Sequence, residues 1–129
     1  VSSLDAAFVI IASMGLGGVR KLEIELGESA MVMGLGLLGI FAVQFCRLSG
    51  AYRVIAADLN PARRELALKL GADYAFDPSA PDFDALYVSC FAASAASRPI
   101  VKVYPALKFS ATVGSNVILV TALFTFAST

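Results

Sequence analysis

Three glycines in one short stretch constrain the fold of this chain more than any other feature. Gly34, Gly36 and Gly39 have the spacing G-x-G-x-x-G and follow an apolar, strand-like run that ends at Met33. From Leu38 onward the apolar residues recur at helical intervals. A strand that runs into a glycine turn and continues as a helix is typical of the start of a parallel β-α-β unit.

An acidic residue completes this pattern. Asp58 lies about 20 residues after Gly39, at the end of a second strand-like run from Arg53 to Ala57. In such a unit the three glycines permit a tight turn, close approach of a pyrophosphate, and close packing of the helix on the sheet. The free N–H groups of the helix start would face the phosphates, and Asp58 would accept hydrogen bonds from the adenosine ribose. The stretch therefore predicts a dinucleotide site; the alternative is a glycine-rich turn in an unrelated loop.

A second glycine cluster, Gly15-Leu16-Gly17-Gly18, lies upstream. No strand-like run precedes it, and no acidic residue follows at the required distance, so we interpret it as a flexible turn. The segment Ser2 to Asp5 has the [ST]-x-x-[DE] form that is typical of a helix start.

Two further elements should follow the second strand. Asn60 can cap a helix and Pro61 suits its first position, so we expect a helix to Leu70, with Gly71 as its stop. Its expected buried residues are Leu66, Ala67 and Leu70. Asp73 to Phe76 then predicts a third strand. The fold class is therefore α/β, a doubly wound, Rossmann-like parallel sheet in three layers, with the three strands in spatial order 3-2-1.

After Pro78 the pattern leaves alternatives open, including an incomplete second half of the sheet. Residues 85–89 could form a fourth strand, 96–110 fit a helix or an alternating strand, and 117–120 could form a fifth strand. We divide the chain into a linker helix and turn, residues 1–27, and a dinucleotide-binding domain, residues 28–129. Within that domain, residues 28–78 carry the pattern just described.

Composition limits the classes of partner. Hydrophobic residues make up 58% of the chain, which suits a parallel sheet buried on both faces. The formal net charge is zero and no run of like charges occurs, so nothing indicates nucleic acid or an anionic membrane. The uncharged segment Phe109 to Thr129 is long enough to raise the question of a membrane helix, but polar residues interrupt it. We interpret Val117 to Val120 within it as a buried strand. The first residues lack a basic n-region, so we expect no signal peptide and a cytoplasmic protein.

The chain contains no histidine, which excludes Ser-His-Asp catalysis, Cys-His catalysis and a histidine-based zinc site within it. Cys46 and Cys90 are far apart in the sequence, and we expect both to be buried free thiols. No residue is assigned a catalytic or metal-ligating role.

Several stretches resemble the cofactor domain of the zinc-type medium-chain alcohol and polyol dehydrogenases. The resemblance is detailed from Leu22 to Pro78. The stretches that carry it are Gly27-Glu28-Ser29, residues 32–39, Ala42-Val43-Gln44, residues 54–63 and residues 67–73. Beyond Pro78 it is faint: residues 83–88 resemble the family's fourth strand and 114–120 its fifth, but Cys90 stands where the family usually has a glycine.

The resemblance implies an NAD-binding region of an oxidoreductase. Asp58 would hold the ribose hydroxyls and repel a 2′-phosphate, which favours NAD over NADP. Arg63 falls where the family often has a basic residue near that ribose, although it could equally be a solvated helix charge, and Arg64 should face solvent. The implied cofactor-binding residues are Gly34, Gly36, Leu37, Leu38, Gly39, Asp58 and Arg63.

In this family a separate domain holds the catalytic zinc. The chain therefore resembles a cofactor-domain fragment or a truncated paralogue, which we expect to bind no zinc and to be inactive alone. A second hypothesis is a non-catalytic remnant that binds nucleotide or pairs with another copy through its late strands, around Val117 to Phe126.

Overall fold

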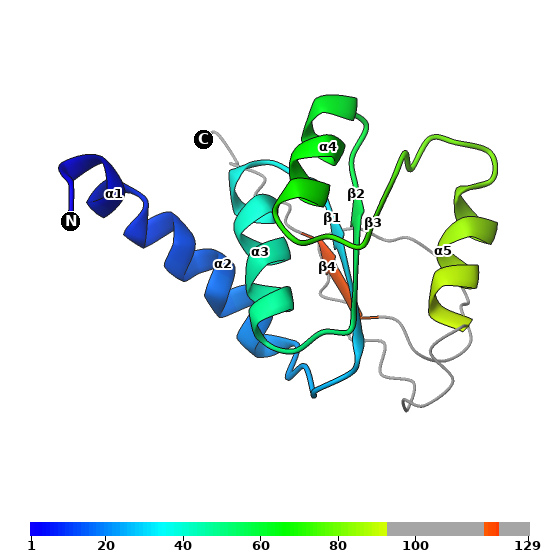
Figure 1. Cartoon of the computed structure of the whole chain (residues 1–129), viewed down its shortest axis with the longest axis horizontal. Helices are drawn as coiled ribbons and strands as arrows, with labels where there is room; N and C mark the ends of the chain where they lie inside the picture. Colours follow the sequence, from blue (N-terminus) through cyan, green and yellow to red (C-terminus); the bar gives the residue numbers. More distant parts are fainter. Residues whose placement is uncertain (93–117, 122–129) are drawn as a thin grey trace, which may run out of the picture.

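The computed structural model describes residues 1–92 and 118–121. Its elements alternate between helix and strand after two N-terminal helices (Figure 1). In chain order they are α1 (Ser3–Ala7), α2 (Val9–Lys21), β1 (Ser29–Met33), α3 (Leu37–Leu48), β2 (Arg53–Ala57), α4 (Pro61–Lys69), β3 (Tyr74–Phe76), α5 (Phe83–Ala92) and β4 (Ile118–Thr121).

The described strands form one parallel sheet in the order β3-β2-β1-β4. The predicted order of the first three strands is confirmed, and the strand predicted near residues 117–120 is present as β4. The chain leaves β1 toward β2 on one side, whereas β4 pairs with β1 on the other. The carboxyl end of β1 is therefore the point where the strand order reverses, which is where open α/β sheets bind ligands.

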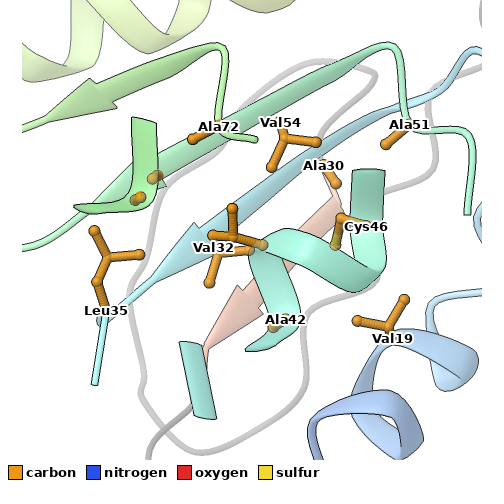
Figure 2. Close-up of a cluster of buried hydrophobic side chains, with 12 residues drawn as sticks. Val19, Ala30, Val32, Leu35, Ala42, Cys46, Ala51, Val54 and Ala72 are labelled. Carbon is orange, nitrogen blue, oxygen red and sulfur yellow. The ribbon is translucent and has the colours of Figure 1, made fainter. Parts of the chain in front are cut away.

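Helices cover both faces of this sheet. In Figure 1, α2, α3 and α4 lie on one side and α5 on the other. Alternate residues of β1 follow this division: Ala30 and Val32 point into the α3 face, and Met31 points into the α5 face. Figure 2 shows the larger cluster, to which α2 contributes Val19 and α3 contributes Cys46. Both faces of β1 are thus buried, as the apolar composition predicted.

The flexible turn predicted at the upstream glycines is wrong, because α2 runs through all of them. Gly15 is buried against α3, and a Cβ there would lie 3.3 Å from the Cβ of Phe41 and 3.5 Å from the carbonyl oxygen of Leu38. Its missing side chain lets the two helices lie close together. Packing has overridden the low helix propensity of glycine, which local sequence cannot reveal.

The expected helix after β2 is confirmed. The Asn60 side chain accepts a hydrogen bond from the Ala62 amide at 2.9 Å, and Gly71 follows the helix with φ of 114°. Of the three residues expected to be buried, Ala67 is buried and Leu70 is half-buried. Leu66 is 44% exposed, so that expectation is wrong, because α4 turns Ala67 rather than its neighbour toward the sheet.

The fourth strand that residues 85–89 suggested is also wrong, since these residues lie within helix α5. Periodicity alone does not distinguish a short apolar run in a strand from one in a buried helix. In the structure, Phe83 and Cys90 are seven positions apart on the helix and both pack against the cluster of Met31, Ile55 and Ala57. Cys90, expected to be buried, is half-buried there, whereas Cys46 is fully buried.

The alternatives for residues 96–110 lie outside the described residues. So does most of the uncharged segment from 109 to 129. Within the part of the chain that the structure describes, no helix has both the length and the apolarity needed to cross a membrane.

Candidate nucleotide-binding site

The turn between β1 and α3 begins at a glycine with left-handed backbone geometry. Gly34 has φ of 86°, a conformation that side chains with a Cβ rarely adopt. Its amide donates to the carbonyl oxygen of Ala57 at 2.8 Å, which extends the pairing with β2 by one residue beyond Met33. The chain can therefore turn away from the sheet immediately after the last strand residue.

Gly39 is required by the same turn. A Cβ at this position would lie 1.9 Å from the carbonyl oxygen of Gly34 and 2.9 Å from its carbonyl carbon. Both are backbone atoms, which cannot rotate out of the way. Gly39 thus allows the first turn of α3 to pack directly on the turn, in the role expected of the third glycine.

Gly36 differs from the other two glycines because no described residue requires it. Its φ is −66°, which any residue can adopt, and a Cβ added there would meet no atom of residues 1–92 or 118–121 within 4 Å. Gly36 is the N-cap of α3, and Leu37 and Leu38 are the first two helical residues. The amides of these positions have no partner within a helix, so they are available to an anion above the turn.

Asp58 lies at the carboxyl end of β2 and faces the glycine turn. Its Oδ2 accepts a hydrogen bond from the Leu35 amide at 2.7 Å, and its Oδ1 accepts one from the Asn60 amide at 2.8 Å. Burial opposes ionisation of this carboxyl, but the two backbone bonds and the nearby Arg63 outweigh burial and lower its pKa. Asp58 is therefore an anion, and each of its oxygens keeps a lone pair for another donor.

The two arginines of α4 behave differently. Arg63 is 53% exposed, and its Nη1 lies 3.7 Å from Oδ2 of Asp58, so the basic residue expected beside the ribose acceptor is close to it. Arg64, which was expected to face solvent, is only 21% exposed. Its Nη1 donates to the carbonyl oxygens of Asp58 and Leu59 and to a carboxylate oxygen of Asp77. That expectation is wrong, because Arg64 is held by three acceptors near the ends of β2 and β3.

The structure thus brings the seven implied residues together at the carboxyl ends of β1 and β2. Five lie in the glycine loop and the first turn of α3, and the other two are Asp58 and Arg63. The sequence did not indicate the bond from the Leu35 amide to Asp58 or the three hydrogen bonds of Arg64. Leu35 lies between two of the motif glycines, so the G-x-G spacing was a signal that its amide faces the turn. No comparable signal distinguishes Arg64 from Arg63.

These features define the class of the protein. It has a parallel α/β sheet with a glycine turn at the point where strand order reverses, a helix N-terminus above that turn, and an acidic residue at the end of the next strand. This is the Rossmann-like class of nucleotide-binding regions.

Comparison with known proteins places the chain within that class. Residues 38–93 match the model of the zinc-binding dehydrogenase family. L-galactonate-5-dehydrogenase of Escherichia coli is 38% identical over 96 residues, which cover 74% of this chain and 28% of that protein. Over its nucleotide-binding region, the chain belongs to the zinc-binding dehydrogenase family.

Solved structures agree. A zinc-binding dehydrogenase from Clostridium scindens superposes with a TM-score of 0.65 and 34% identity, covering 67% of this chain and 24% of that one. A second, from Sinorhizobium meliloti and bound to NADP, has a TM-score of 0.54 and 36% identity, covering 56% of this chain and 21% of that one. The chain spans less than a third of the length of each of these three relatives.

A zinc ion does not fit the described residues. Among residues 1–92 and 118–121, no three His, Cys, Asp or Glu side chains lie where they could hold a metal ion.

Proposed function

We propose that this chain supplies the NAD-binding region of an alcohol- or polyol-type dehydrogenase. The pyrophosphate would lie over Gly36 and the first amides of α3, contributed by Leu37 and Leu38. The ribose of the adenosine half would lie at Asp58, with Arg63 beside it. Gly34 and Gly39 would shape the turn without touching the reacting part of the cofactor.

The observation that carries this proposal is the open space at Gly36. The neighbouring glycines are explained by the protein itself, through a positive φ at Gly34 and a backbone clash at Gly39. Gly36 has neither explanation, and a Cβ there would meet nothing within 4 Å in the part of the chain that the structure describes. A ligand that approaches the backbone closely accounts for a glycine at this point, and the helix N-terminus favours an anionic one.

Each group would contribute binding and orientation rather than chemistry. The nicotinamide, when bound, supplies the position that accepts or donates hydride. The amides of α3 would neutralise phosphate charge, and the Asp58 carboxylate would accept hydrogen bonds from ribose hydroxyls. These contacts hold the adenosine half of the cofactor and so set where its other half lies.

We propose NAD rather than NADP as the preferred cofactor. The carboxylate of Asp58 is ionised and only 10% exposed, so a 2′-phosphate beside it would meet a fixed negative charge. Arg63 opposes this effect, since its exposed guanidinium lies close enough to attract a phosphate. The related Sinorhizobium meliloti protein was solved with NADP, so both cofactors belong in the test.

Calorimetric titration of the purified chain with NAD+ and NADP+ tests the proposal, beside an Asp58→Asn variant. Asparagine removes the charge and keeps one acceptor oxygen for either Leu35 or Asn60, so it disturbs the turn less than alanine would. We expect NAD+ to bind more tightly than NADP+ to the wild-type chain. In the variant, NAD+ should bind about tenfold more weakly and the preference should shrink.

A folded wild-type chain that binds neither nucleotide would contradict the proposal and favour the non-catalytic remnant. Thermal unfolding of both proteins shows whether each is folded. Equal binding of NAD+ by the wild type and the variant would remove Asp58 from the site.

Several sequence-based expectations stay predictions. We propose residues 1–27 as the helix and turn that lead into the nucleotide-binding domain, residues 28–129. We also expect the chain alone to oxidise no alcohol, which an assay with added Zn²⁺ and NAD+ would test. Pairing of two copies through the late strands is open to sedimentation measurements.

A further inference from the structure

We propose that Arg64 is a positioning residue for the adenosine half of the nucleotide site, and that it acts by joining the loops that follow β2 and β3. This inference rests on the proposed function. It adds a residue that does not itself face the ligand and so differs from the contacts assigned above.

One nitrogen atom of Arg64 donates to three acceptors. Nη1 of Arg64 lies 2.7 Å from the carbonyl oxygen of Asp58, 3.0 Å from that of Leu59 and 3.0 Å from Oδ2 of Asp77. The first two acceptors belong to the loop after β2, and the third begins the loop after β3. One side chain of α4 therefore links the loop after β2 to the loop after β3.

The link made by Arg64 lies just beyond the end of the pairing between β2 and β3. The pairing of β2 with β3 ends at Ala57 and Phe76, followed by one longer backbone bond of 3.3 Å from the Asp58 amide to Phe76. Arg64 bridges the two loops immediately beyond that point. The far side of the bridge is itself held, because Oδ1 of Asp77 accepts hydrogen bonds from the amide and hydroxyl of Ser79.

The proposed path of the dinucleotide leads toward the two loops that Arg64 joins. With the pyrophosphate above the start of α3 and the ribose at the end of β2, the dinucleotide crosses the sheet edge from β1 toward β3. The adenine base then lies beyond Asp58, on the side of the loop that Asp77 begins. Arg64 fixes both the backbone of the ribose acceptor and that loop, so its loss should weaken binding of the adenosine half.

The burial of Arg64 supports a positioning role over direct contact. Its side chain is 21% exposed, against 53% for the adjacent Arg63, and its guanidinium is committed to protein acceptors. The hydrogen bonds from Ser79, and to a smaller extent the Arg64 guanidinium, lower the pKa of Asp77, so the carboxylate stays charged for the link.

The test titrates wild type, Arg64→Gln, Arg64→Lys and Asp77→Asn with NAD+ and with AMP, which carries only the adenosine half. We expect Arg64→Gln to weaken both ligands about tenfold, and Arg64→Lys to recover part of the loss. Combining Arg64→Gln with Asp77→Asn should weaken binding less than the product of the two single effects, because both remove the same link.

Arg47→Gln is the matched control. Arg47 also forms an ion pair, with Asp73 at 3.1 Å, but it lies in the last turn of α3, and Asp73 precedes the first residue of β3 whereas Asp77 follows the last. It should leave both affinities unchanged even if it lowers the unfolding temperature. Amide hydrogen exchange without ligand gives a second readout, in which Arg64→Gln should speed exchange at residues 77–82 and leave β1 unaffected.

The outcomes separate the two proposals. A folded wild-type chain that binds neither NAD+ nor AMP would overturn the proposed function, and the positioning role with it. A wild type that binds both, beside a folded Arg64→Gln that binds them equally well, would overturn the positioning role alone.

Discussion

Replacing Gly36 by aspartate should change folding and nucleotide binding in opposite directions. Gly36 is the N-cap of α3 with extended backbone geometry, φ −66° and ψ −171°, and a Cβ there meets no described residue within 4 Å. Aspartate is among the best N-cap residues and complements the positive end of the helix. We therefore expect Gly36→Asp to raise the free energy of unfolding by about 0.5–1 kcal/mol.

The same carboxylate would occupy the space assigned to the pyrophosphate. Two unit charges about 4–5 Å apart repel by about 3–4 kcal/mol at an effective dielectric constant near 20, and by roughly half that where solvent screens them. The affinity for NAD+ should therefore fall by about thirtyfold or more. Urea unfolding measures the first effect and calorimetric titration with NAD+ the second.

Ser3→Asp is the control for added charge, because Ser3 is exposed and begins α1, far along the chain from the glycine turn. It should leave the affinity for NAD+ unchanged. If Gly36→Asp binds NAD+ as tightly as the wild-type chain does, the pyrophosphate does not lie at Gly36. If the free energy of unfolding of the variant falls by more than about 1 kcal/mol, a side chain at Gly36 does meet other atoms of the protein.

Three further predictions follow from the same region and core. Gly39→Ala should destabilise the fold by about 3 kcal/mol or more in urea unfolding, because its Cβ would meet the Gly34 carbonyl. Gly17→Ala should stabilise the fold slightly, because Gly17 lies within α2 and a Cβ there would meet no described residue within 4 Å. Equal effects of the two substitutions on the free energy of unfolding would refute this prediction. The lowered pKa of Asp58 means that its carboxylate stabilises the fold above its ordinary pKa of about 3.9 and that this contribution is lost as pH falls through the lower folded value. The acid-side loss of stability should thus shrink in Asp58→Asn. Burial raises the pKa of Cys46 to about 12, so a thiol reagent should label it in urea but not in the folded chain at about pH 8, as peptide mass mapping would show.

Local signals account for what could be predicted from the sequence. The glycine turn, the strand that ends at Asp58 and the cap at Asn60 each depend on residues within a few positions of one another. Such features are decided by backbone geometry and by short hydrogen bonds, and the chain carries the residue types they need. The order of the first three strands followed because connections between parallel strands are right-handed.

The features that could not be predicted depend on contacts between distant segments. Gly15 lies inside a helix that packs against Phe41 of α3, and α5 packs Phe83 and Cys90 against the second face of the sheet. Arg64 and Arg63 are adjacent in the sequence, yet only the rotation of α4 relative to Asp77 decides which one is held by the protein. No pattern within a short window contains that information.

The hydrogen bond from the Leu35 amide to Asp58 has a consequence for the rate of nucleotide binding. At 2.7 Å it holds the glycine turn against the end of β2 through atoms of the chain itself. The entropy of ordering this turn is therefore lost when the chain folds and is not lost again on association. Stopped-flow traces should show a single phase whose observed rate rises linearly with NAD+ concentration, since no slow rearrangement of the turn has to precede or follow the encounter.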